Sequence, residues 1–221
     1  MPTLKVLDLS ANFNLRKLPT SFFGLVSLQY LDLSWTGIRE LPIEFQSLVK
    51  LKYLYLNGMY ALDIIPQQVM SSLLNLQRLE MRGHGGSGVS SKENIDEGSS
   101  VLFGGNELEC LNHLQYLSLT VKTELALQKL LSLQKFLSFA FGLCISGFKG
   151  SISLPLSSLQ KKMKRLELLE IERCDDIEEL SMDGMRWEER ERPHENNHPW
   201  DMKSIIDGSR SFQNLWEVRI T

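Results

Sequence analysis

Leu4-Lys5-Val6-Leu7-Asp8-Leu9 is the stretch that decides the fold, because its spacing of leucines recurs along the chain. The L-x-x-L-x-L spacing begins again at Leu28, Leu51 and Leu76, so the first four copies start 24, 23 and 25 residues apart. Further copies begin at Leu114, at a weaker Ala140, at Leu166 and at Leu215. About eight copies of one short pattern therefore account for much of the 40 leucines among the 221 residues.

Each L-x-L pair predicts a short strand whose alternate side chains enter one core while the residue between them faces outward. One copy cannot bury its own leucines, but stacked copies place their strands side by side and share a core. The period falls within the roughly 20 to 29 residues of a leucine-rich repeat. We therefore expect an α/β leucine-rich-repeat solenoid, a curved horseshoe with short parallel strands on its concave face. Irregular turns and short helices would form the convex face.

The ninth position of the motif tests this interpretation, because a buried polar side chain there needs hydrogen-bond partners in the adjoining loop. Asn12, Thr36 and Cys174 occupy it in three copies and suit that role. Met59 and Lys122 do not, so we expect this row of polar side chains to be interrupted.

Two segments interrupt the period within what we expect to be a single domain spanning residues 1–221. Residues 83–105 are rich in Gly, Ser and charge and predict a mobile loop insertion. Residues 181–211 are charged and predict a second loop insertion. Polar caps that would cover the first and last repeats are missing, so we expect the chain to be a fragment of a longer protein.

Composition and charge restrict the class of partner. The 24 Lys and Arg against 27 Asp and Glu leave a net charge of −3, which favours neither nucleic acid nor an anionic membrane surface. The chain has no apolar run of about 18 residues, the length a membrane span requires. Three cysteines at wide spacings predict reduced thiols, and we expect a cytoplasmic protein.

Two stretches carry a resemblance to a known family. LKVLDLSANFNLRKLPTSFFGLVSLQYLDLSWTGIRELP (4–42) and KRLELLEIERCDDIEEL (164–180) resemble the leucine-rich-repeat region of plant intracellular disease-resistance proteins of the nucleotide-binding, coiled-coil class. In that family LDLS is followed by an I-x-x-LP turn, and a later repeat ends L-x-I-x-x-C. Extracellular plant receptors instead carry L-x-G-x-I-P turns and N-x-[ST] sequons, neither of which occurs here.

The resemblance implies a non-enzymatic recognition and regulatory module in plant innate immunity. Its partner would be a pathogen effector, a modified host protein, or the nucleotide-binding domain of the same polypeptide. No G-x-x-x-x-G-K-[ST] motif occurs, so the family's nucleotide site lies outside this chain. A generic intracellular leucine-rich-repeat scaffold without an immune role is the alternative, and the sequence before Met1 would separate the two.

Two motifs suggest other chemistry. His194-Glu195-Asn196-Asn197-His198 matches the H-E-x-x-H of zinc hydrolases, but Pro193 and Pro199 bracket it and no apolar stripe supports a helix. This context disfavours the alternative of a zinc hydrolase. Gly83-x-Gly85-x-x-Gly88 lacks the amphipathic helix that a phosphate-binding turn requires. We expect no catalytic residue, no cofactor and no metal.

Outward residues of neighbouring strands line up across the repeats and would form the partner surface. Aromatic residues and arginine on adjacent repeats have the composition of protein-interface hot spots. The alternative is that this sheet face is only solvated and binds no partner, because tyrosine is also a residue with a high propensity for strands. The residues that we expect to bind a protein partner are Tyr30, Asp32, Trp35, Tyr53, Tyr55, Arg78, Glu80 and Tyr116.

Overall fold

The computed structural model describes most of the repeats that the sequence predicts. It describes residues 4–62, 65–83, 110–122, 124–147, 153–155, 159, 162–172, 174, 179–181 and 217–220. Nearly all of the two expected insertions, 83–105 and 181–211, lies outside these residues. The chain divides into two compact units, Met1–Thr120 and Val121–Thr221. A single domain spanning both stays a prediction.

Short strands alternate with short helices along the first unit. The strands are β1 (Val6–Asp8), β2 (Tyr30–Asp32), β3 (Tyr53–Tyr55), β4 (Arg78–Met81) and β5 (Tyr116–Val121). The helices are the 3-10 helices η1 (Thr20–Gly24) and η2 (Ile43–Ser47) and the α-helix α1 (Gln67–Ser72). The strands pair in parallel in chain order, with Leu7, Leu31, Leu54, Leu79 and Leu117 aligned. This register confirms the leucine period.

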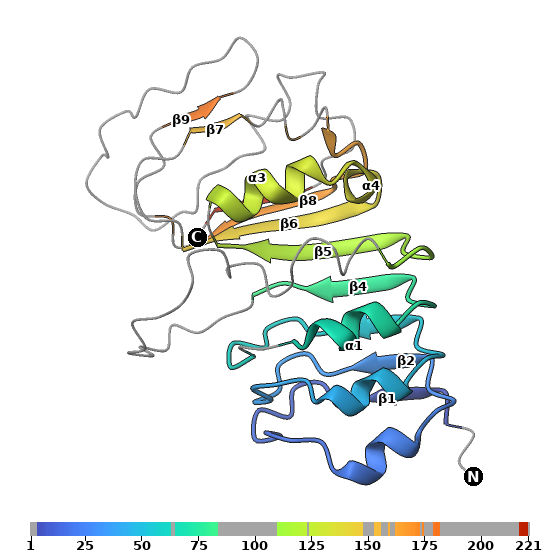
Figure 1. Cartoon of the computed structure of the whole chain (residues 1–221). Helices are drawn as coiled ribbons and strands as arrows, with labels where there is room; N and C mark the ends of the chain where they lie inside the picture. Colours follow the sequence, from blue (N-terminus) through green and yellow to red (C-terminus); the bar gives the residue numbers. More distant parts are fainter. Residues whose placement is uncertain are drawn as a thin grey trace. The chain divides into compact units, whose positions relative to one another are not determined.

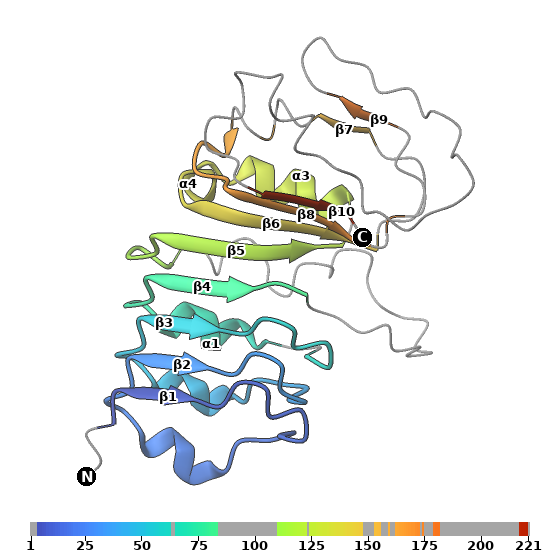
Figure 2. The same ribbon diagram turned by 180° about the vertical axis from the view of Figure 1, so that it is seen from behind.

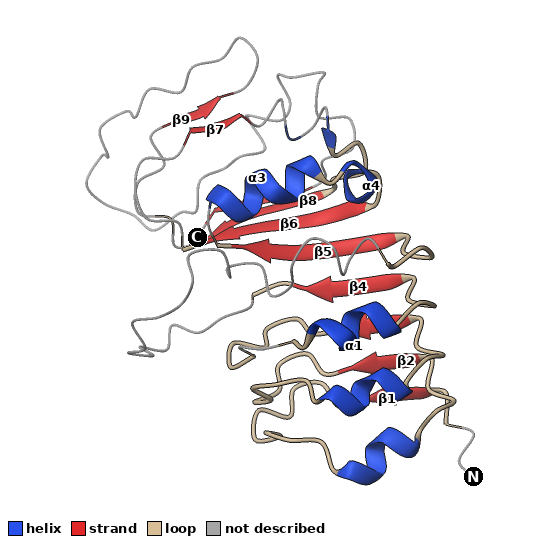
Figure 3. Cartoon of the chain, viewed as in Figure 1, coloured by secondary structure: helices blue, strands red, loops and turns tan. Residues whose placement is uncertain are grey.

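The helices of the first unit cover one face of its sheet and leave the other face open. They lie in front of the strands in Figure 1 and behind them in Figure 2, and Figure 3 shows them in blue against the red strands. Leu31, Leu54 and Leu79 lie fully buried between the two layers. Side chains that alternate with these leucines therefore project from the open face.

A proline precedes each of the three helices in the first unit. Pro19, Pro42 and Pro66 have φ angles of −67°, −71° and −60°, values to which the pyrrolidine ring restricts proline in any case. Each helix then turns a large apolar residue inward, and the buried rings of Phe22 and Phe45 lie 6.3 Å apart. The helical layer is thus periodic in the same way as the sheet.

A left-handed residue follows each of the first four strands. Ala11, Trp35, Gly58 and Gly83 have φ angles of 59°, 60°, 63° and 67°. The amides of Ala11, Trp35 and Gly58 donate to the carbonyls of Ser34, Asn57 and Arg82 at 2.7 to 2.8 Å. Gly83 donates instead to the Thr120 hydroxyl at 2.8 Å. The turn after each strand is therefore hydrogen-bonded to the next repeat, which prolongs the sheet pairing.

The polar ninth position behaves as the motif predicts. The Asn12 side-chain amide donates to the Leu9 carbonyl at 2.7 Å, and the Thr36 hydroxyl donates to the Leu33 carbonyl at 2.8 Å. In the second unit the Cys174 thiol lies 3.4 Å from the Glu172 carbonyl. All three side chains contact a backbone carbonyl at or just after the end of the preceding strand, as the motif predicts, although Asn12 is exposed.

The second unit contains its own parallel strands. Its elements are α3 (Glu124–Ser132), α4 (Gln134–Leu137), β6 (Ala140–Ser146), β7 (Ser153–Pro155), β8 (Leu168–Glu172), β9 (Glu179–Ser181) and β10 (Glu217–Ile220). Strand β8 pairs with β6 and β10, which aligns Leu143, Leu169 and Val218. Strands β7 and β9 form a separate pair. The weak copy beginning at Ala140 is therefore a true member of the repeat.

Candidate functional site

Two rows of side chains run across the open face of the first unit. The register aligns Val6, Tyr30, Tyr53, Arg78 and Tyr116 in a first row. It aligns Asp8, Asp32, Tyr55, Glu80 and Ser118 in a second row, two residues further along each strand. Seven of the eight predicted partner-binding residues belong to these rows, and Trp35 lies just beyond strand β2. Their side-chain surroundings differ in a way that the spacing does not reveal.

Three tyrosines form an aromatic group over strands β2 and β3. The ring centroid of Tyr30 lies 5.2 Å from that of Tyr55 and 6.4 Å from that of Tyr53, with the ring planes tilted by about 40°. Tyr53 is 37% exposed. These distances are those of favourable aromatic pairs. The group therefore offers an ordered aromatic surface toward solvent.

Arg78 is held within the protein by residues from three repeats. Its guanidinium carbon lies 3.7 Å from the ring centroid of Tyr116, a cation–π distance. Its Nη1 donates to the Tyr55 hydroxyl at 3.4 Å and lies 3.7 Å from Glu80 Oε1. Burial lowers the pKa of Arg78, but the hydrogen bond to Tyr55 and the nearby charges outweigh it and raise the pKa overall. Arg78 therefore remains cationic and already has partners.

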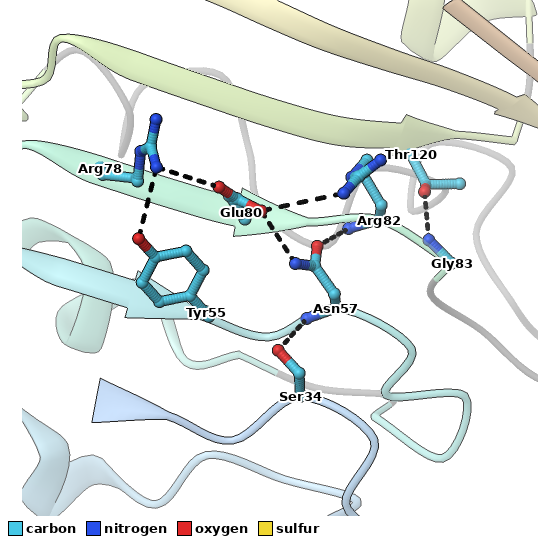
Figure 4. Close-up of polar contacts among 8 residues, drawn as sticks. All are labelled: Ser34, Tyr55, Asn57, Arg78, Glu80, Arg82, Gly83 and Thr120. Atoms are coloured by element: carbon cyan, nitrogen blue, oxygen red, sulfur yellow. Dashed lines mark hydrogen bonds and ion pairs between the residues drawn. The ribbon is translucent and has the colours of Figure 1, made fainter. Parts of the chain in front are cut away.

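Glu80 and Asn57 form the centre of a polar network at the ends of strands β3 and β4 (Figure 4). Glu80 is only 8% exposed, and its Oε2 accepts a 2.9 Å hydrogen bond from Asn57 Nδ2. Arg82 Nη2 lies 3.9 Å from the same oxygen. Asn57 Oδ1 accepts a hydrogen bond from the Arg82 backbone amide at 3.0 Å. The backbone amide of Asn57 donates to the Ser34 hydroxyl at 3.1 Å. Three repeats are therefore joined by one asparagine.

Asn57 is a candidate residue that the sequence reasoning missed, and it acts together with Arg82. Both follow the last leucine-type position of a strand by one residue, where the motif prescribes no residue type. The signal that would have found them is the register itself, because it places position 57 beside position 82 and both beside Glu80. Glu80, in contrast, is only 8% exposed, so little of its side chain is accessible to a partner.

Trp35 lies at the margin of the open face and is 44% exposed. Gly58 occupies the equivalent position of the next repeat, and a Cβ there would lie 2.4 Å from Trp35 Cδ2. The indole therefore rests in the space that a side chain at position 58 would fill. Its ring centroid lies 5.6 Å from that of Tyr60 in an edge-to-face arrangement. Trp35 is thus an ordered, half-exposed aromatic residue.

Asp8 and Asp32 are aligned with each other on strands β1 and β2 and are the first two residues of the second row. Asp32 Oδ1 accepts the Ser34 amide, and Asp8 Oδ1 accepts the Ser10 amide, each at 2.8 Å. Hydrogen bonds from the Ser10 side chain and then from its backbone lower the pKa of Asp8. The Asp8 carboxylate is therefore charged at neutral pH.

The second unit presents a different outward surface. Cys144 and Glu170, which are aligned between β6 and β8, are 0% and 8% exposed. Cys144, Glu170 and Glu172 bring one sulfur and two carboxylates within 4.8 Å of one another. Cys144 and Glu170 also have further interactions of their own, so we interpret the group as part of the packing of β6 on β8. His194 and His198 lie outside the described residues.

Comparisons with known proteins agree with the repeat architecture. A family model described as "Leucine rich repeat" matches residues 1–38. Among solved structures, the leucine-rich-repeat protein LIC12759 of Leptospira interrogans is 26% identical with a TM-score of 0.50. That likeness covers 78% of this chain and 38% of that one. Among the described residues, no helix is both long and apolar enough to cross a membrane.

The similar curated proteins come from plant defence. "Probable disease resistance protein At1g51480" of Arabidopsis thaliana is 34% identical over 220 residues, covering 100% of this chain and 23% of that protein. "Probable disease resistance protein At1g15890" of the same plant is 34% identical over 192 residues, covering 87% and 20%. The chain thus spans a quarter or less of the length of these relatives. Repeat register and similarity together identify it as a leucine-rich-repeat region of the plant disease-resistance protein type.

Proposed function

We propose that this chain is a non-enzymatic protein-recognition and regulatory module of plant innate immunity that acts in the cytoplasm. The open face of the first unit would sense a pathogen effector or a modified host protein. The same face, or residues next to it, would also contribute to autoinhibition of a nucleotide-binding domain that is not part of this chain. The leucine-rich-repeat fold, which generally offers an extended surface for binding, and the similarity to proteins named for disease resistance support this role.

One observation carries the proposal: the open face displays ordered aromatic side chains that the core does not need. Leu31 and Leu54 are fully buried and hold the sheet, whereas Tyr53 and Trp35 are 37% and 44% exposed. Ordering large side chains in contact with water costs conformational entropy and gains little stability within the chain. Aromatic residues in this setting are the type that dominates protein interfaces.

Regulation requires only that the partner distinguish two states of the resistance protein. A ligand shifts a conformational equilibrium by its difference in affinity for the two states. If the open face binds the nucleotide-binding domain in the resting state, an effector that competes for the same tyrosines would release that domain. Competition for one face is the simplest arrangement that gives both recognition and autoinhibition.

The test is replacement of Tyr30 and Tyr53 by Ala in the full 221-residue chain. Tagged wild-type and variant chains would be expressed in leaf tissue with and without pathogen challenge, and co-purified proteins quantified by mass spectrometry. We expect wild-type chain to retain at least one specific protein partner that the Tyr30→Ala/Tyr53→Ala variant loses about tenfold or more, as hot-spot truncation implies.

The matched control is Val26→Ala with Val49→Ala. Both valines are about half exposed and lie in turns four residues before Tyr30 and Tyr53, so the control removes a similar periodic pair outside the two rows. The control variant should retain the partner. Equal recovery of partners by all three chains would overturn the proposal, and a partner unrelated to pathogen or immune response would favour the generic scaffold.

A further inference from the structure

The acidic face, which we define as Val6, Asp8, Tyr30, Asp32 and Tyr53, combines carboxylates with aromatic rings on adjacent strands. The β1–β2 register places Asp8 beside Asp32, and neighbouring strands lie about 4.8 Å apart. The same register and that of β2–β3 place Val6, Tyr30 and Tyr53 in a line beside them. Val6 is 60% exposed.

Neither carboxylate of the acidic face is neutralised by an ion pair within the described part of the chain. The ion pairs of the two rows join Arg78 and Arg82 to Glu80 instead. Asp8 Oδ1 accepts the Ser10 backbone amide and Asp32 Oδ1 accepts the Ser34 backbone amide, and the Ser10 side chain also hydrogen-bonds to Asp8. Lys5 and Lys52 precede strands β1 and β3, at the opposite ends of the strands from Asp8 and Asp32.

The carboxylates of Asp32, Asp8 and Glu80 place negative charge near the Tyr30 hydroxyl. Burial raises the pKa of the Tyr30 hydroxyl, and the charge of Asp32 raises it further, with smaller contributions from Tyr55, Asp8 and Glu80. The part of this pKa shift that comes from the carboxylates reflects negative charge that also favours a nearby cation, whereas burial disfavours a charge of either sign. Burial has the larger effect on this pKa, so the placement of two aspartates beside the ring is the stronger indication of a cation site.

The surroundings of Arg78 are an example, within the same sheet, of a cation bound between a carboxylate and an aromatic ring. It occupies the first row, pairs with Glu80 two residues further along its strand, and stacks on Tyr116 of the next repeat. A cation above Val6 would find Asp8 two residues further along and Tyr30 in the next repeat. The carboxylate-and-ring arrangement that holds Arg78 therefore recurs in the first repeat around a small apolar side chain.

We propose that the acidic face binds an arginine- or lysine-bearing segment of a protein partner, whose cation lies against Asp8, Asp32 and the ring of Tyr30. Tyr53 lines the same surface and provides apolar contact for the aliphatic part of that side chain. Arginine is favoured over lysine, because its planar guanidinium both stacks on an aromatic ring and forks onto carboxylates. This inference rests on the proposed function and specifies the chemistry of the partner.

The first experiment uses two peptides, acetylated Gly-Arg-Gly-Arg-Gly amide and its analogue with neutral citrulline in place of both arginines. Binding to the full chain at low ionic strength would be followed by NMR shifts of the Tyr30 and Tyr53 resonances. We expect the arginine peptide to bind about tenfold more tightly, and its advantage to shrink at high salt, since exposed charges are screened. Equal binding of both peptides, or no shift with either, would overturn the inference.

The paired variants are Asp8→Asn/Asp32→Asn and, as control, Glu40→Gln/Glu44→Gln. Each removes two negative charges, and Glu40 and Glu44 are exposed residues that lie outside the two rows. Asparagine retains the Oδ1 that accepts the Ser10 and Ser34 amides, so the turns and the melting temperature should be preserved. The aspartate variant should lose the preference for the arginine peptide and the glutamate variant should keep it; the opposite pattern contradicts the proposal.

The same aspartate variant separates this inference from the proposed function. In the leaf-tissue assay, a partner lost with Tyr30→Ala/Tyr53→Ala but retained with Asp8→Asn/Asp32→Asn would leave the recognition role standing and refute the cationic partner. A partner retained by both variants would refute the recognition role itself. A partner lost with both, and kept by both controls, supports the two proposals together.

Discussion

Single residues at the ends of the strands control how one repeat meets the next. Trp35 has the left-handed φ of 60° that most L-residues avoid, and Gly58 has the same conformation one repeat later. The indole of Trp35 occupies the space beside Gly58 Cα, so the absence of a side chain at 58 makes room for an aromatic residue at 35. The identity of one residue thus determines what its neighbour can display on the open face.

Replacing Gly58 by Ala should destabilise the chain by about 2 kcal/mol or more. A left-handed backbone costs an L-residue roughly 1–2 kcal/mol, and the new Cβ must also displace the indole of Trp35. Urea denaturation measures the free energy of unfolding. Gly24→Ala is the matched control, because a Cβ at Gly24 would meet no atom within 4 Å, so this change should alter stability by less than about 1 kcal/mol. Equal effects at the two glycines would show that the Trp35–Gly58 contact is unimportant.

At the scale of strands and helices, the leucine period alone predicted which residues are aligned. Alternation within a strand is strict, so a leucine shifted by one position would face water, and the register Leu7–Leu31–Leu54–Leu79 follows from the spacing. The left-handed turns and the Asn57 network were not predictable in this way. The turns depend on hydrogen bonds to the next repeat, and the Asn57 network depends on polar side chains from three repeats; both form only after the strands are aligned.

The same distinction, between strand alignment and side-chain contacts, explains which features of the candidate site were predictable. The spacing placed Glu80 in the outward row, but it carries no information on how Asn57 and Arg82 surround it. A residue in an outward position is exposed only if its neighbours are short or turn away. The two rows were therefore predictable, whereas their division into the acidic face and an internally satisfied Arg78–Glu80 group required coordinates.

Strand position should determine the cost of removing a core leucine. Leu54 lies between two neighbouring strands and is fully buried, so Leu54→Ala should cost about 2–5 kcal/mol. Leu7 is only half-buried in strand β1, and Leu7→Ala should cost well under half as much. Chemical denaturation of the two variants gives the comparison. A cost at Leu7 equal to that at Leu54 would mean that β1 is as well packed as β3, against the burial seen.

On the scale of the whole molecule, most of the leucines in the described repeats form a core that each repeat shares with its neighbours, whereas Leu4 and Leu74 are exposed. In such a stack, stability is approximately a sum of repeat and nearest-neighbour contributions. The first unit shows the expected gradient, since Leu9 is half-buried while Leu33 and Leu56 are fully buried. Within the first unit, strand β1 of the acidic face is therefore less covered than strands β2 and β3.

Hydrogen exchange of equivalent amides tests this gradient directly. The amides of Leu9, Leu33 and Leu56 donate to the carbonyls of Asp32, Tyr55 and Glu80 at 2.8 to 2.9 Å, so the three bonds are alike in geometry. Exchange of buried amides requires local opening, whose free energy falls toward weakly packed ends. Leu9 should therefore exchange at least about tenfold faster than Leu33 and Leu56. Uniform protection would mean that the first unit opens as a single cooperative block, whereas selective slowing of Leu9 exchange by the arginine peptide would locate binding at strands β1 and β2.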